Sequence, residues 1–223
     1  MGVLSDDERE RLLITAIDVL AEKGSAGFDV REIARRTEFD LVLVLEEVGT
    51  VGATLRALAR HLDHKMVGSG SAWNEEGLSV RERLFELVMQ RFDAMSPFKS
   101  GLERLTADRR SDPLPNLQTL CNLDRSAGWM LATAGVNVSG MGGGLRRAAM
   151  AQAYARVVRV WLRDSSPDLG PTMAELDKRL AELEDWASGL ARFARFDRRR
   201  SEDNAGTPKD DNGLNDAGEA PVA

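Results

Sequence analysis

The sequence has one cysteine, Cys121, and two histidines among its 223 residues. A single cysteine excludes a disulfide within the chain and a thiolate metal cluster. No run of the sequence approaches the roughly 18 uninterrupted apolar residues that a membrane-spanning helix needs. The acidic first ten residues also lack the apolar segment of a secretory signal. We therefore expect a protein without an integral membrane segment, located in the cytoplasm.

Patterns that indicate catalysis or metal binding are also missing. The sequence contains no Gly-x-Ser-x-Gly motif, and Cys121 is far along the chain from both histidines. His61 and His64 have a spacing that can serve a metal on a helix, but nearby residues do not complete a ligand set. We expect them to be surface histidines near a helix end. The sequence thus predicts a protein that is not an enzyme and has no metal or cofactor.

The chain is acidic, and its charge is unevenly distributed. The net charge is −6, and residues 1–67 contain thirteen acidic and nine basic side chains. A domain that binds nucleic acid normally shows a basic surface, because neutralising phosphates drives its affinity. The charge of the N-terminal third therefore argues against DNA binding.

Apolar residues recur every three or four positions along most of the chain, and strand signals are nearly absent, which predicts an all-α fold. Expected helices over 5–23, 30–36, 41–48 and 50–65 form a helix-turn-helix domain of residues 1–67. Ser5 and Glu8 form one capping box, and Asp29 with Glu32 is expected to cap the second helix.

The second half of the chain is predicted to be a separate helical domain. A Gly/Ser-containing break follows residue 67, and a second capping box, Ser79 with Glu82, begins the domain of residues 78–196. The glycines of 140–144 are expected to form a flexible connection between helices. The tail, residues 197–223, has few apolar residues and is expected to be disordered.

Two segments carry a family resemblance. The stretch ITAIDVLAEKGSAGFDVREIARRTEF, residues 14–39, resembles the opening of TetR-family transcriptional regulators. The stretch WLRDSSPD…LDKRL, residues 161–180, is similar to the TetR-fold proteins of ubiquinone biosynthesis that bind isoprenoid lipids. The resemblance implies a TetR-like fold, with an N-terminal DNA-binding domain, a helical domain that binds a small effector, and a homodimer.

In TetR-family regulators the third helix enters the major groove, and the resemblance places that helix over residues 41–48. Here it begins with five apolar residues followed by Glu46 and Glu47, which would repel phosphates. The candidate DNA-binding residues are Arg31, Arg35, Arg36, Asp40, Leu41, Val42 and Leu43. Two interpretations stay open: the protein is a DNA-binding regulator, or it has lost operator binding and its apolar third helix faces a partner or a lipid surface.

Large apolar side chains on several predicted helices of the second domain could line a pocket for a small hydrophobic ligand. The candidates are Phe85, Met89, Phe92, Trp129, Met130, Met150, Tyr154 and Trp161. The alternative is that these side chains simply fill the core.

The last two long helices are the candidate dimer interface. Residues 145–163 carry small residues at helical spacing, and residues 172–196 carry apolar residues at heptad-like spacing. Two such helices from each subunit would form a four-helix interface with two-fold symmetry. Packing within one chain is the alternative.

Overall fold

The computed structural model describes residues 4–68, 77–107 and 114–205. All regular secondary structure in these residues is helical, which confirms the predicted all-α fold. The chain divides into two compact units, Met1–Glu184 and Asp185–Ala223. The fold and the candidate site described below belong to the first unit.

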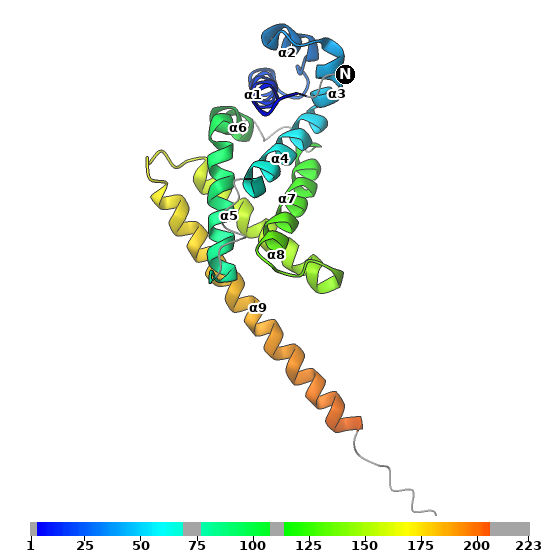
Figure 1. Ribbon diagram of the computed structural model, residues 1–223, viewed down its shortest axis with the longest axis vertical. Helices are drawn as coiled ribbons and strands as arrows, with labels where there is room; N and C mark the ends of the chain where they lie inside the picture. Colours follow the sequence, from blue (N-terminus) through cyan, green and yellow to red (C-terminus); the bar gives the residue numbers. More distant parts are fainter. Residues whose placement is uncertain (1–3, 69–76, 108–113, 206–223) are drawn as a thin grey trace, which may run out of the picture. The chain divides into compact units, whose positions relative to one another are not determined.

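The N-terminal end of the first unit consists of four helices, α1 (Asp6–Lys23), α2 (Val30–Thr37), α3 (Leu41–Val48) and α4 (Val51–Gly68), shown in blue and cyan in Figure 1. Helices α1 and α3 pack on α4, and α2 packs on α1 and α3. The Ser5–Glu8 capping box starts α1 as predicted, and Gly24 ends it with a positive φ of 68°. Ile17, Ile33 and Val44, one from each of the first three helices, are fully buried in the continuous hydrophobic core of the first unit.

One predicted cap differs. The Asp29 side chain accepts a hydrogen bond from the Arg31 backbone and so caps α2. Glu32 does not reach back to the cap, because its carboxylate instead binds the guanidinium groups of Arg35 and Arg36.

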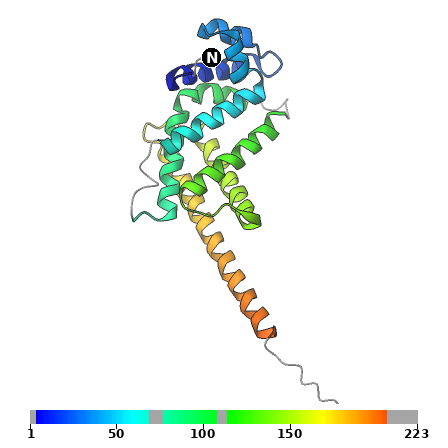
Figure 2. The same cartoon turned by 45° about the vertical axis from the view of Figure 1, so that its right-hand side comes forward.

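The rest of the first unit contains α5 (Val80–Met95), a 3₁₀ turn (Ser96–Phe98), α6 (Lys99–Ala107), α7 (Leu114–Thr133), α8 (Gly140–Trp161) and the first part of α9 (Gly170–Ala205). The capping box of Ser79 and Glu82 starts α5 as predicted. Helix α4 packs on α5 and α7, α7 packs on α8, and α6 packs on α1 (Figures 1 and 2). The largest fully buried side chains of this core are Trp161, Phe92 and Phe98.

The glycine-rich segment is a helix start and not the predicted loop. Helix α8 begins at Gly140, and Ser139 stands at its N-cap. A Cβ on Gly143 would lie 2.1 Å from the carbonyl carbon of Val138. A glycine is therefore required there, because the first turn of α8 packs directly on the backbone that precedes it.

The end of the chain also differs from its prediction. Helix α9 continues to Ala205, so residues 197–205 are helical. The rest of the predicted disordered tail, and most of the predicted break between the two domains, lie outside the described residues.

Candidate functional site

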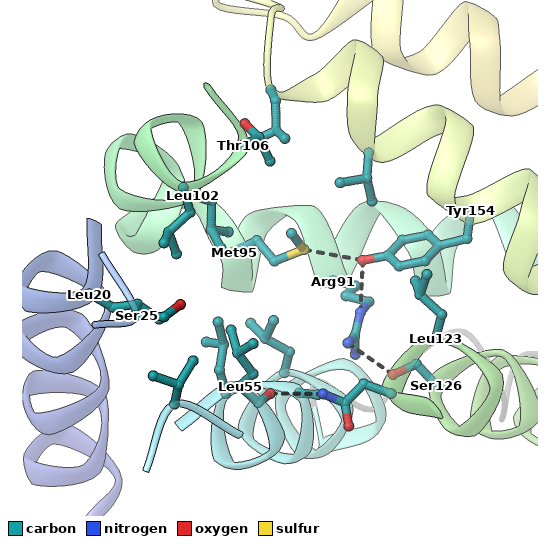
Figure 3. Close-up of a pocket in the computed structure, with 18 of the residues that line it drawn as sticks. Leu20, Ser25, Leu55, Arg91, Met95, Leu102, Thr106, Leu123, Ser126 and Tyr154 are labelled. Atoms are coloured by element: carbon teal, nitrogen blue, oxygen red, sulfur yellow. Dashed lines mark hydrogen bonds between the residues drawn. The ribbon is translucent and has the colours of Figure 1, made fainter. Parts of the chain in front are cut away.

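A cavity of about 590 Å³ lies between helices of the first unit. Its walls come from the end of α1 and the loop that follows it, and from α4, α5, α6, α7 and α8 (Figure 3). The apolar part of the lining comprises Leu20, Ala26, Val51, Leu55, Leu58, Ala59, Leu62, Met95, Leu102, Leu105, Leu123, Val158 and Leu162. This volume lies within the range of about 300–1,000 Å³ typical of small-molecule sites.

The helical repeat brings these side chains to one place. Leu55, Leu58 and Leu62 follow one another at three- and four-residue spacing along α4, so they share one face of that helix. Val158 and Leu162, four residues apart, form a matching face near the end of α8. Leucines of α6 and α7 complete an apolar wall, and such a wall favours an apolar ligand.

One end of the cavity is polar. The Arg91 guanidinium of α5 donates to the Tyr154 hydroxyl at 2.9 Å, to the Ser126 hydroxyl at 3.1 Å and to the Asp63 carboxylate. Figure 3 shows Arg91, Ser126 and Tyr154 gathered beside the leucine-lined space. Tyr154 in turn donates to the Met95 sulfur at 3.2 Å. We call Asp63, Arg91, Ser126 and Tyr154 the buried polar cluster.

The buried polar cluster is shielded from water. Its four residues are all at most 6% exposed, and burial raises the pKa of the Tyr154 hydroxyl, which therefore keeps its proton. Asp63 is fully buried and accepts a second hydrogen bond, at 2.7 Å, from Arg125. A buried carboxylate held by two arginines satisfies its charge without water.

Sequence reasoning missed Arg91 and Asp63, although the pattern contained a signal. Arg91 lies four residues after Leu87, on the apolar face of α5, and Asp63 lies four residues after Ala59, on the apolar face of α4. A charged residue within an apolar stripe indicates a buried, paired charge. The two residues are 28 positions apart, and nothing in the sequence shows that they pair with each other.

The eight predicted pocket residues do not line one cavity. Only Tyr154 lines the cavity described above. Phe92, Met130, Met150 and Trp161 are fully buried in the core, which was the alternative interpretation. Phe85 and Met89 pack against that core from partly buried positions. Trp129 is 39% exposed and stacks on His64.

His61 is not the surface residue that the sequence indicated. Its ring is 6% exposed and packs edge-on against Phe98, and its Nε2 lies 3.7 Å from the Glu10 carboxylate. Burial lowers the pKa of His61. The folded protein therefore favours neutral His61, and its contribution to stability is lost as the pH falls from about 6.5, the unfolded value.

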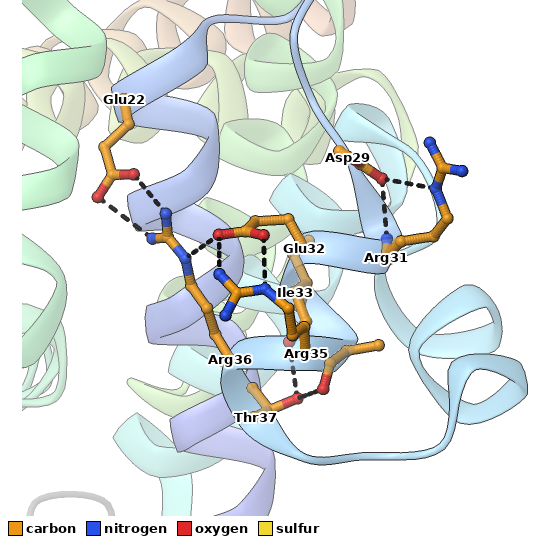
Figure 4. A network of polar contacts seen from close by, with 9 residues as sticks. Glu22, Asp29, Arg31, Glu32, Ile33, Arg35, Arg36 and Thr37 are labelled. Atoms are coloured by element: carbon orange, nitrogen blue, oxygen red, sulfur yellow. Dashed lines mark hydrogen bonds and ion pairs between the residues drawn. The ribbon is translucent and has the colours of Figure 1, made fainter.

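The three arginines of the candidate DNA-binding surface are paired with carboxylates of their own domain (Figure 4). Arg36 binds Glu22 at 2.8 Å and Glu32 at 2.8 Å, and Arg35 binds Glu32 at 2.7 Å. These two guanidinium groups lower the pKa of Glu32 to about 2, so it is ionised at neutral pH. Arg31 pairs more weakly with Asp29, at 3.4 Å.

The exposed face of α3 is apolar and acidic. Leu41, Val42 and Leu45 are 40%, 60% and 48% exposed, and Glu46 next to them is also exposed. Leu43 packs partly against the core. Asp40 caps α3 by accepting a hydrogen bond from the Val42 backbone. The four candidate DNA-binding residues from 40 to 43 therefore provide no positive charge and no free side-chain donor.

Asp164 fixes the turn between α8 and α9. Its buried carboxylate accepts hydrogen bonds from the hydroxyl and the backbone of both Ser166 and Thr172. These hydrogen bonds hold the pKa of Asp164 well below its ordinary value. The carboxylate thus sets the angle at which α9 leaves α8.

The described residues contain neither a metal-binding cluster nor a membrane-spanning helix. No cluster of three or more histidine, cysteine, aspartate or glutamate side chains there could hold a metal ion. None of the helices in that part of the chain is both long and apolar enough to cross a bilayer.

Comparisons with known proteins agree with both resemblances in the sequence. A family model described as COQ9 matches residues 145–187, the segment from α8 through the Asp164 turn into α9. No curated protein matches the chain.

One solved structure shows the same fold. The crystal structure of a TetR transcriptional regulator from Nitrosomonas europaea ATCC 19718 superimposes with a TM-score of 0.59 at 17% identity, covering 79% of this chain and 97% of that one. A transcriptional regulator from Rhodococcus sp. Rha1 matches with a TM-score of 0.44 at 23% identity, covering 78% and 95%. At 17% identity the likeness to the Nitrosomonas regulator shows the fold alone.

Proposed function

Because the chain has the fold of a TetR regulator and contains an apolar cavity, we propose that it is a binding protein for a small hydrophobic molecule and not an enzyme. The observation that carries the proposal is the cavity of about 590 Å³ itself, lined mainly by leucines of several helices and closed at one end by buried polar groups. Such a lining stabilises an apolar ligand by removing it from water.

The side chains of the N-terminal helices support the interpretation that the protein has lost operator binding. Arg35 and Arg36 are neutralised by Glu32 and Glu22, so releasing them to phosphates would break existing ion pairs. The exposed face of α3 offers Leu41, Val42 and Leu45 where a recognition helix needs donors and acceptors for base edges. We therefore infer that ligand binding, and not DNA binding, is the main activity.

The first prediction concerns a variant that fills the cavity. In Leu55→Trp the indole would occupy space between α4 and α8, so we expect loss of binding of a neutral fluorescent probe, N-phenyl-1-naphthylamine. Arg56→Trp is the matched control, because Arg56 is exposed on the same helix and does not line the cavity. The measurement is the rise in probe fluorescence on titration with protein. Equal binding by wild type and Leu55→Trp would contradict the proposed site.

DNA-binding regulation is the second candidate function, and the arrangement of α1, α2 and α3 favours it, since this is the part of the TetR fold that contacts DNA. Selection of fragments from random DNA at low salt separates the two candidates. We expect recovery no better than from bare resin. Enrichment of a two-fold-symmetric site would support the regulator.

A variant makes this DNA test sharper. Glu32→Gln removes the carboxylate that holds Arg35 and Arg36, and we expect it to raise non-specific DNA affinity by up to about fivefold, the range of exposed ion-pair energies. Glu86→Gln, an exposed change of the same charge on α5, is the control. An unchanged affinity in Glu32→Gln would show that the ion pairs do not limit DNA binding.

We further propose a homodimer through residues 145–163 and 172–196. Ala148 is exposed on α8, and Ala151 and Ala155 are half-buried, so small side chains leave room for the close approach of a second helix. Light scattering of the full chain at micromolar concentration should give twice the mass of one chain. We expect Ala148→Arg to shift the mass toward the monomer, whereas a monomeric wild type would refute the dimer.

A further inference from the structure

The polar end of the cavity is rich in hydrogen-bond donors and poor in acceptors. Arginine carries five N–H groups and no acceptor. Arg91 uses three of them, on Tyr154, Ser126 and Asp63. Among the described residues, the remaining two N–H groups, one on each terminal nitrogen, have no acceptor.

The two hydroxyls beside Arg91 are also poorly satisfied as donors. Tyr154 donates to the Met95 sulfur, and a thioether is a weak acceptor. Ser126 accepts from Arg91, and within the described part of the chain its own hydrogen has no acceptor. A buried donor without a good acceptor costs free energy. An oxygen acceptor placed in the cavity would satisfy these donors.

The charge of this end is positive. Arg91 and Arg125 both bind Asp63, which leaves one net positive charge on the three residues. Arg91 and Asp63 are almost fully buried, so water screens this charge only weakly. A ligand group with one negative charge would balance the cluster, whereas a doubly charged group would overcompensate it.

We propose that the cavity binds an apolar chain that ends in a carboxylate, with the carboxylate at Arg91, Ser126 and Tyr154 and the chain along the leucines of α4 and α6. This inference rests on the proposed function, since it names the chemical class of the ligand for the same cavity. The carboxylate accepts from the two remaining N–H groups of Arg91 and from the hydroxyls of Ser126 and Tyr154. The tail occupies the part of the cavity lined by Leu55, Leu102 and Leu105.

Displacement of N-phenyl-1-naphthylamine from the full chain tests this assignment. The competitors are dodecanoate and methyl dodecanoate, which share the chain and differ in the charge of the head group. Because hydrogen bonds to a charged group contribute more than neutral ones, dodecanoate should displace the probe at a concentration roughly 10- to 100-fold lower than the ester.

Two variants locate the source of this preference. Asp63→Asn combined with Arg91→Gln removes the buried pair and the N–H donors of Arg91, and it leaves only the partly exposed Arg125 charged. Because the carboxylate then loses its main donors, the variant should abolish the preference for dodecanoate while the ester still binds. Arg125 lies outside the cavity lining, and Arg125→Gln lowers the net charge of the cluster. This variant should weaken the binding of dodecanoate and leave the binding of the ester unchanged. Arg147→Gln, which breaks an exposed ion pair with Asp124, is the control and should change neither competitor.

The outcomes separate the two proposals. If dodecanoate and its ester displace the probe equally well, the carboxylate assignment is wrong and the apolar site stands. A preference that survives in both Asp63→Asn/Arg91→Gln and Arg125→Gln also overturns the assignment. If the wild-type protein does not bind the neutral probe or either competitor, the proposed function itself fails.

Discussion

Asp63→Leu is expected to lower the free energy of unfolding by about 3–5 kcal/mol, the range for breaking a buried ion pair by removing one partner. Asp63 is fully buried and holds both Arg91 and Arg125. In the variant the Arg91 guanidinium, which is only 4% exposed, stays buried without its counter-charge. Guanidinium chloride unfolding measures the change.

Asp124→Leu is the matched control for this prediction. Asp124 pairs with Arg147, but its side chain is 51% exposed, so its loss should change stability by less than about 1 kcal/mol. Similar small effects in both variants would show that Asp63 and Arg91 are not a buried pair in the folded protein. The buried polar cluster would then not exist as described.

Trp161→Ala is expected to cost about 3–5 kcal/mol, the usual range for removing a large aromatic side chain from a core. Trp161 is fully buried at the end of α8 and stacks on Phe92, with ring centres 5.4 Å apart. The Lys99 amine lies over the Trp161 ring, 5.0 Å from the ring centre. The substitution would therefore leave a large space where α5, α6 and α8 meet.

Trp129→Ala provides the comparison within the same chain. Trp129 is 39% exposed and stacks on the exposed His64, so its removal should cost no more than about 1.5 kcal/mol, the range for an aromatic pair. Thermal and chemical unfolding of both variants gives the ratio of the two losses in unfolding free energy. A larger effect at Trp129 than at Trp161 would contradict the placement of the core.

The sequence was most informative where structure depends on neighbouring residues. The capping boxes at Ser5 and Ser79 form as predicted, and α3 has the predicted bounds. A cap is a contact between residues three positions apart, so the sequence alone contains the information for it. The glycines at the start of α8 were wrongly predicted to form a loop. Gly143 is needed instead for the close packing of the helix on the Val138 backbone.

The candidate site was less predictable, because it depends on contacts between distant helices. Large apolar residues such as Phe92 and Trp161 were as plausible for a pocket as for a core, and only the packing shows that they fill the core. The cavity lies instead along the smaller leucines of α4 and α6. The ion pairs of Arg36 with Glu22, fourteen positions away, also come from folding and not from a motif.

Under the proposed function, these contacts explain how a helix-turn-helix fold serves without reading DNA. The core residues that build α1–α3 are present, whereas Arg35 and Arg36 on α2 are paired with Glu22 and Glu32. Fold and DNA recognition depend on different side chains, since the first needs buried apolar residues and the second needs exposed donors.

The most direct test of the central claim is a crystal structure of the protein soaked with 1-bromododecane, in which anomalous scattering locates the bromine. We expect the bromine and its chain inside the cavity, in contact with Leu55, Leu58 and Val158, and no such density in a crystal of Leu55→Trp. The neutral ligand keeps this test independent of the carboxylate assignment. Bromine found only on the exposed face of α3, or an unoccupied cavity in the wild-type crystal, would contradict the claim that this protein binds an apolar molecule between α4 and α8.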